Sequence, residues 1–178
     1  MISCFIILPI VKLPAGEKFS ELYLLGSQKM AQDLPFNILQ GKNYTVYLGV
    51  GNHLDSLAYY LCSVKVRNQT ETTINDEKPR LSDAVYQYRT MLQNGVNWTV
   101  PLTFSFSEIN FANTQSTLKT LTINDIKVNI NKTTLFDQNN NGYYYQILVE
   151  LWAFNSASGS FEYQNRSVYF WLNATSSV

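Results

Sequence analysis

The chain has 178 residues and a formal net charge of zero, from 13 basic and 13 acidic side chains. That length fits one domain, and the balanced charge excludes the basic footprint expected of proteins that bind nucleic acids or anionic lipids. Charged residues make up only 15% of the chain and aromatic residues 14%. Because aromatic and β-branched residues favour strands, the composition predicts a β protein whose surface is polar through Ser, Thr, Asn and Gln.

An apolar run from Ile2 to Val11 opens the chain. Its length is about half of the ~20 residues that span a bilayer, and it lacks the basic region and cleavage site of a signal peptide. Three interpretations stay open: a first β-strand, which we favour, a short anchor, or the stub of a membrane helix. We therefore divide the chain into residues 1–12, a strand or anchor remnant, and residues 13–178, a single β-sandwich domain.

Alternation of apolar and polar residues with period two dominates the rest of the chain. It is strongest in residues 43–50, 59–67, 97–106, 126–131 and 165–173. Further strands are expected near Phe19–Leu25 and Tyr143–Phe154. One-sided alternation is typical of antiparallel sheets with one buried face. With the N-terminal run, the pattern predicts an all-β antiparallel sandwich of about eight strands.

One segment, residues 79–95, departs from this pattern. Ser82 can cap the start of a helix, and Gly95 can supply the left-handed residue at its end. The apolar stripe between them consists of Val85, Tyr88 and Leu92. We therefore predict one short crossover helix over about 81–93, packed on the sandwich.

Six Asn-x-Ser/Thr sequons predict N-glycosylation, which marks exported chains and exposed Asn. Composition alone would give about three, so the excess is roughly twofold. Strand parity places five of them on polar faces, whereas Asn68 shares the inward parity at a strand end. The acceptors are Asn43, Asn68, Asn97, Asn131, Asn165 and Asn173.

The chain offers few residues for catalysis. His53 is the single histidine and lies between two strands beside Asp55, where capping a turn is a more ordinary role than general base. Cys62 has the apolar parity of its strand and is expected to be a small buried hydrophobe, with a bridge to Cys4 as the alternative. We therefore expect no enzyme activity and keep an accessory hydrolase as an alternative. Such an enzyme would need two carboxylates converging on His53.

The segment Asp137–Gly142 matches the start of a calcium loop, in which oxygen ligands alternate and Gly permits a sharp turn. The ligands would be Asp137, Asn139, Asn141 and the Tyr143 carbonyl. The twelfth position, which should be Glu, is Leu148. A β-hairpin turn is the more ordinary interpretation, so no cofactor is expected beyond a weak calcium site.

Aromatic residues gather late in the sequence. Four of them have the parity opposite to the inferred core of their strands, namely Trp152, Phe154, Tyr169 and Trp171. Exposed rings can form a protein interface or stack on sugars, and they can also be buried within the domain. All three interpretations stay open.

Three segments of the first third resemble a known family: Gly16–Gly26, Leu39–Gly41 and Val46–His53. They are similar to a family of predicted archaeal membrane proteins, the domain of unknown function numbered sixteen-sixteen, over about residues 10–68. The sequence departs from the family pattern at Ser20, Leu22 and Leu54. The resemblance implies an Ig-like sandwich on the outer face of an archaeal membrane, carried behind membrane helices.

Together these features predict a non-enzymatic structural or adhesive domain of the archaeal cell envelope or of a surface assembly. We expect it to be extracellular, N-glycosylated and tethered to the membrane at its N-terminus in the anchor interpretation. Its partners would be other envelope proteins or copies of itself, met through protein contacts that include pairing of the apolar N-terminal run with an edge strand. The alternative is a glycan-binding module that uses the late aromatic residues.

Overall fold

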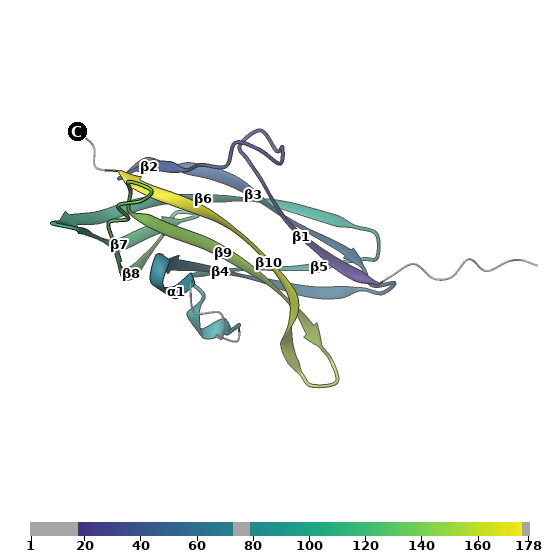
Figure 1. Ribbon diagram of the computed structural model, residues 1–178. Helices are drawn as coiled ribbons and strands as arrows, with labels where there is room; N and C mark the ends of the chain where they lie inside the picture. The colour runs from purple at the N-terminus through teal and green to yellow at the C-terminus, as the bar shows by residue number, and fades with distance from the viewer. Residues whose placement is uncertain (1–17, 73–78, 176–178) are drawn as a thin grey trace, which may run out of the picture.

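The computed structural model describes residues 18–72 and 79–175, which form two packed β-sheets (Figure 1). The first sheet has the strand order β1-β3-β6-β7-β8 and the second has the order β2-β10-β9-β4-β5. The strands are β1 Phe19–Leu25, β2 Asn37–Leu39, β3 Tyr44–His53, β4 Ala58–Asn68, β5 Tyr86–Leu92, β6 Asn97–Ala112, β7 Gln115–Ile123, β8 Ile126–Leu135, β9 Tyr144–Asn155 and β10 Ser160–Thr175.

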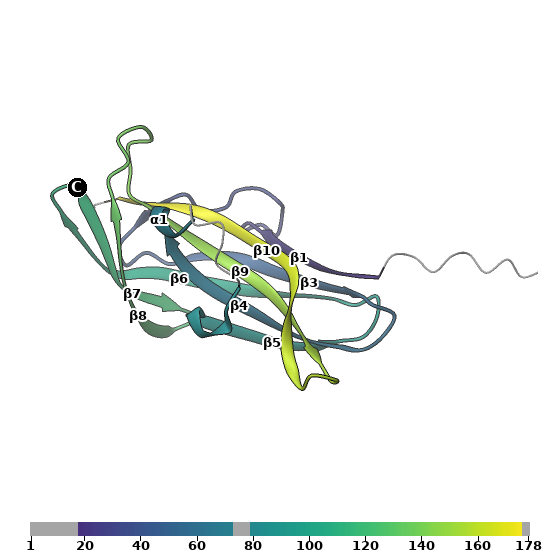
Figure 2. The same ribbon diagram turned by 60° about the horizontal axis from the view of Figure 1, so that its bottom comes forward.

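This architecture confirms the expected all-β, Ig-like sandwich, with ten strands in place of about eight. Neighbouring strands run antiparallel, except that β2 pairs in parallel with the end of β10. The β9–β10 hairpin extends beyond the sandwich, as both views show (Figure 2). Residues 1–12, expected as strand or anchor, lie outside the described residues. Among the residues described, no helix has the length and apolar character needed to cross a membrane.

The core lies between the sheets and follows the predicted parity. On β3, Val46, Leu48 and Val50 are fully buried. On β4, Cys62 and Val64 face them from the second sheet and are equally inaccessible. Removing such side chains from water is the main stabilising contribution, at about 25 cal/mol per Å² of apolar surface.

The predicted crossover helix over 81–93 is wrong. The structure has a short 3-10 turn, η1 Leu81–Asp83, followed by strand β5. The error has a physical cause, because Tyr88 and Leu92 are four residues apart and fit both a helical stripe and one face of a strand. Gln87, Arg89 and Met91, at alternate positions of β5, are exposed, and a helix would not produce this period of two. Gly95 does adopt a positive φ of 76°, but in the β5–β6 turn.

Candidate functional site

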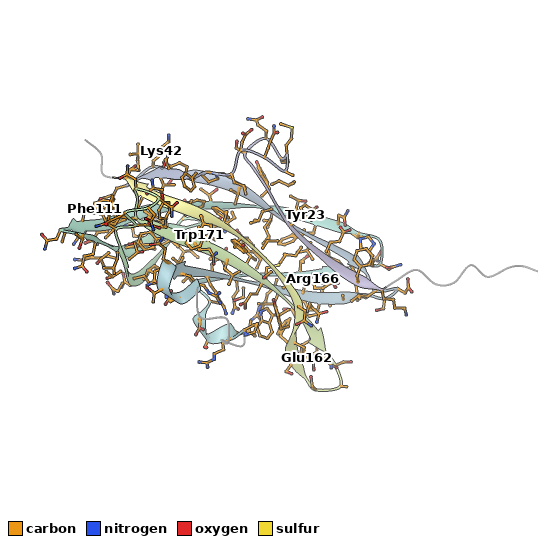
Figure 3. All side chains as sticks on the ribbon, in the orientation of Figure 1. Tyr23, Lys42, Phe111, Glu162, Arg166 and Trp171 are labelled. Carbon is orange, nitrogen blue, oxygen red and sulfur yellow. The ribbon has the colours of Figure 1, made fainter. Side chains whose placement is uncertain are left out.

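The four late aromatic residues come together on the outer face of the second sheet. Successive outward positions of β9 carry Trp152 and Phe154, while β10 carries Tyr169 and Trp171. Neighbouring strands add residues of the same kind. We call this surface the aromatic face: Tyr59, Leu61, Met91, Leu148, Trp152, Phe154, Phe161, Tyr163, Tyr169 and Trp171. In Figure 3, Trp171 and Glu162 mark two separate points along β10, near the two ends of this face.

The rings near the β9–β10 hairpin pack on one another. Phe161 lies 5.2 Å from Tyr59 and 5.5 Å from Phe154, measured between ring centroids. Trp152 packs on Tyr163 at 5.5 Å. Such contacts are worth about 0.5–1.5 kcal/mol beyond the area they bury. The rings are therefore held in place before any partner binds.

A buried ion pair runs through the middle of this face. Lys65 on β4 and Glu150 on β9 have side chains that are 4% and 2% exposed, and Lys65 Nζ lies 3.0 Å from Glu150 Oε2. Arg67 approaches the same carboxylate at 4.0 Å. Strand parity predicts that Lys65 points outward, as the structure shows. Parity does not predict that the Lys65 side chain is buried there. Removal of either partner would leave an uncompensated buried charge, which is strongly destabilising.

The rim of the aromatic face is open to solvent. Met91 is 64% exposed, Tyr169 57% and Phe154 43%. The exposed Arg89 sits beside them, with its guanidinium 5.7 Å from the centre of the Phe161 ring. Aromatic residues, Met and Arg are the types enriched in protein interfaces. The surface therefore combines a buried, rigid centre with an accessible apolar rim.

One hollow of about 310 Å³ lies beyond Trp171. Its walls are aromatic and its polar groups are neutral amides, the lining being Phe36, Gln69, Asn140, Tyr144 and Trp171. Tyr144 is fixed there because its hydroxyl donates a hydrogen bond to the Asn140 carbonyl at 2.6 Å. Aromatic faces beside amide groups suit a neutral polar ring such as a sugar.

The outer face of the first sheet is chemically different. Cross-strand hydroxyl pairs connect its strands: Thr45 with Thr103 at 3.0 Å, Thr117 with Thr133 at 2.9 Å and Ser107 with Thr122 at 2.5 Å. We call this surface, with Thr99, the threonine face. Hydroxyl pairs of this kind stabilise a sheet by fractions of a kcal/mol each, roughly 0.2–1. The surface is polar and partly exposed.

The predicted glycan acceptors fall into two groups. Four are exposed: Asn43, Asn97, Asn131 and Asn165. The other two, Asn68 and Asn173, are half-buried. Asn43 and Asn97 share the outward parity of the threonine face, and Asn131 lies on its edge strand β8. Glycosylation of any of them stays a prediction.

The predicted calcium ligands form a closed turn. Asp137 Oδ1 accepts the backbone N–H of Asn139 and of Asn140, and Oδ2 accepts the side-chain amides of Asn140 and Gln69. The hydrogen bonds from Asn140 hold the pKa of the Asp137 carboxyl below its usual range. The Tyr143 carbonyl accepts the Ala174 N–H, and Asn141 has a positive φ of 55°. The turn is closed by an antiparallel bridge between Asp137 and Gly142, but it connects β8 and β9, which lie in different sheets, so it is not the turn of a β-hairpin between paired strands. Calcium binding stays a prediction.

His53 and Cys62 take ordinary structural places. The His53 ring stacks on Phe19 at 4.6 Å, and its Nε2 lies 3.5 Å from a Glu21 oxygen. Asp55 pairs with Lys18 at 3.5 Å, and the two-carboxylate arrangement of an accessory hydrolase stays a prediction. Burial raises the pKa of the Cys62 thiol to about 12. The predicted buried role of Cys62 is confirmed, while Cys4 lies outside the described residues.

Sequence reasoning identified four of the ten residues of the aromatic face and missed the other six. Tyr59 and Phe161 are outward neighbours of Phe154 on the flanking strands, but strand order is needed to see this. Met91 lies in the segment that was predicted to be a helix, so its outward position on a strand was not predicted. The parity of Tyr59, opposite to that of the core residue Tyr60, is the one signal that could have identified an outward aromatic.

The family model of a domain of unknown function, DUF1616, matches residues 13–173. The chain therefore belongs to this family, as the resemblance of its first third predicts. No curated protein matches the chain significantly.

Among solved structures, the chain is similar to the β-glucosidase from Listeria innocua. The complex with isofagomine matches with a TM-score of 0.45 and 13% identity, and covers 90% of this chain but 16% of that one. The complex with glucose matches with a TM-score of 0.44 and 13% identity, over 89% and 16% of the two chains. The chain thus spans a small part of the glucosidase, and this distant likeness carries no argument about activity.

Proposed function

We propose that this chain is a non-enzymatic, extracellular structural or adhesive domain of the archaeal cell envelope or of a surface assembly. It carries N-glycans and acts through protein–protein contacts. The observation that carries the proposal is the aromatic face, where rings and Arg side chains lie on the outside of a sheet that already has its own core. An outer face of this kind is expected where another protein covers it.

The charges on this face favour an acidic protein partner over a second copy of the chain. Lys65 and Arg67 both lie within 4.0 Å of Glu150, and Arg89 is a further cation, so these four charged side chains together carry a net positive charge. Two aromatic faces packed against each other would place these cations near their own copies. A neighbouring envelope protein with an apolar centre and carboxylates at its rim would complement them.

Binding of the full chain to a cell-envelope fraction from the native source tests this proposal. The double variant Phe154→Asp/Tyr169→Asp places charges on two exposed rim positions of the aromatic face. We expect at least a tenfold loss of binding in a sedimentation assay, and weaker binding at higher salt. The matched control, Asn110→Asp/Asn129→Asp, charges exposed positions of the first sheet that belong to no sequon and should bind within twofold of the unmodified chain. Equal losses in both variants would contradict the proposal.

A glycan-binding module is the second candidate, because the hollow beside Trp171 has aromatic walls and neutral amides. Titration with monosaccharides and short glycans, followed by tryptophan fluorescence, tests it. In this reading Trp171→Ala abolishes binding, whereas Tyr169→Ala, on the same face but outside the hollow, retains it. A glycan array without binding would remove this candidate.

A further inference from the structure

The side chain of Asn68, the last residue of β4, makes hydrogen bonds that stabilise the fold. It caps the short helix α1 Gln69–Thr72: its Oδ1 accepts the Glu71 N–H at 2.9 Å, and Glu71 Oε2 accepts the Asn68 N–H at 3.0 Å. This reciprocal pair is a capping box. Its Nδ2 donates to the Thr133 carbonyl of β8 at 2.8 Å. The sequon Asn68–Thr70 therefore overlaps a local structural motif that also connects the two sheets.

The side chain of Asn173, near the end of β10, also makes structural hydrogen bonds. Its Nδ2 donates to Asn37 Oδ1 of β2 at 3.0 Å, and its Oδ1 accepts the Tyr143 N–H at 3.0 Å. Gly142 gives it room, because a Cβ there would lie 2.4 Å from Asn173 Oδ1. Both ends of the carboxamide are thus held between strand β2 and the turn before β9.

The other four acceptor side chains contrast with these two. All are exposed, and their carboxamides make no hydrogen bond with any residue that the structure describes. Asn131 and Asn165 lie where β8 and β10 lose register with their neighbours, and both have left-handed backbones, with φ of 51° and 52°. Asn tolerates this conformation better than other non-Gly residues. The irregularities turn these amides away from the ladder.

We propose that N-linked oligosaccharides are attached to the folded domain at Asn43, Asn97, Asn131 and Asn165, and that Asn68 and Asn173 are structural amides that carry none. In the transfer step, Nδ2 forms a bond to C1 of the sugar, the C1–O bond of a glycosyl phosphate donor breaks, and the amide proton and the phosphate group leave. Nδ2 is the atom that Asn68 and Asn173 commit to hydrogen bonds. The inference rests on the proposed export of the chain.

Glycopeptide mapping of the full chain purified from its native source tests this division. We expect sugar on the four exposed acceptors and unmodified Asn68 and Asn173. Sugar on Asn68 or Asn173 at similar occupancy would overturn the division, since transfer would then precede folding, but would leave export standing. Absence of sugar from all six would overturn both this division and the main support for export.

Stability measurements on full chain made in a host without N-glycosylation separate structural amides from accepting ones. Asn68→Gln and Asn173→Gln should lower the Tm by about 3–6 °C, because a longer side chain cannot keep both hydrogen bonds. The matched variants Asn43→Gln and Asn97→Gln should shift the Tm by less than about 1 °C. Equal shifts at all four positions would contradict a structural role for Asn68 and Asn173.

Discussion

The two outer faces of the sandwich differ more than the two halves of its core. The threonine face is joined by hydroxyl pairs and carries exposed Asn residues of the sequons. The aromatic face buries Leu61, Leu148 and an ion pair, although it lies outside the core between the sheets. The first surface is built to remain in water. The aromatic face is a small additional core surrounded by exposed apolar side chains. Burial in this fold is therefore not confined to the space between the sheets.

The largest expected effect comes from breaking the ion pair of the aromatic face. Glu150→Gln leaves the Lys65 ammonium buried without a full counter-charge, and we expect a loss of about 3–5 kcal/mol in the free energy of unfolding. Urea unfolding measures it. On the threonine face, Thr45→Val removes a half-buried hydroxyl pair and should cost about 1 kcal/mol or less. Similar losses of unfolding free energy for the two variants would contradict the view that the aromatic face, unlike the threonine face, contains a buried core.

A second variant tests whether the aromatic face behaves as a core. Leu61 is 1% exposed, so Leu61→Ala should lower the free energy of unfolding by about 2–4 kcal/mol through lost burial and a residual cavity. Phe154→Ala, at a rim position with ring contacts to Tyr59 and Phe161, should cost less, about 1–2 kcal/mol. If the rim variant were the more destabilising, the division into a buried centre and an open rim would be incorrect.

We expect the free energy of unfolding to decrease in alkaline solution because of groups in the core between the sheets. Burial raises the pKa of Cys62 and of Tyr88 to about 12, from 9.0 and 10.0. Both groups are neutral in the folded state. Their contribution to the free energy of unfolding is therefore complete at a pH below the pKa values of the unfolded chain and is lost as the pH rises toward 12. We expect the urea midpoint to fall between pH 9 and 12 and to fall less steeply in Cys62→Ala. An unchanged slope would show that the thiol does not contribute.

The smallest expected effect concerns the turn at Asp137, which joins a strand of each sheet. Because the carboxylate is satisfied by its own turn, millimolar calcium should produce no calorimetric heat and no change in Tm. Saturable heat that disappears in Asp137→Asn would establish the calcium site instead.

Period-two alternation was sufficient to predict the sandwich and its core, because each residue that β3 and β4 contribute to the core between the sheets follows its strand parity. It failed for β5, where Tyr88 and Leu92 satisfy two periodicities at once. Parity also predicted that Trp152 and Trp171 face outward. It could not predict that Lys65 meets Glu150, since their strands are joined through non-local pairing. The sequon pattern likewise does not reveal that Asn68 caps a helix and Asn173 joins β2 to β9.

The parallel pairing of β2 with β10 has a consequence for the folding reaction. The Asn37–Asn173 hydrogen bond joins residues 136 positions apart, and β2 has no other neighbour in its sheet. Non-local pairings of this kind make all-β domains fold slowly, on the order of milliseconds to seconds. The second sheet therefore stays incomplete until residues 160–175 have joined it. Until β10 has formed, the edges of β2 and β9 that face it remain unpaired.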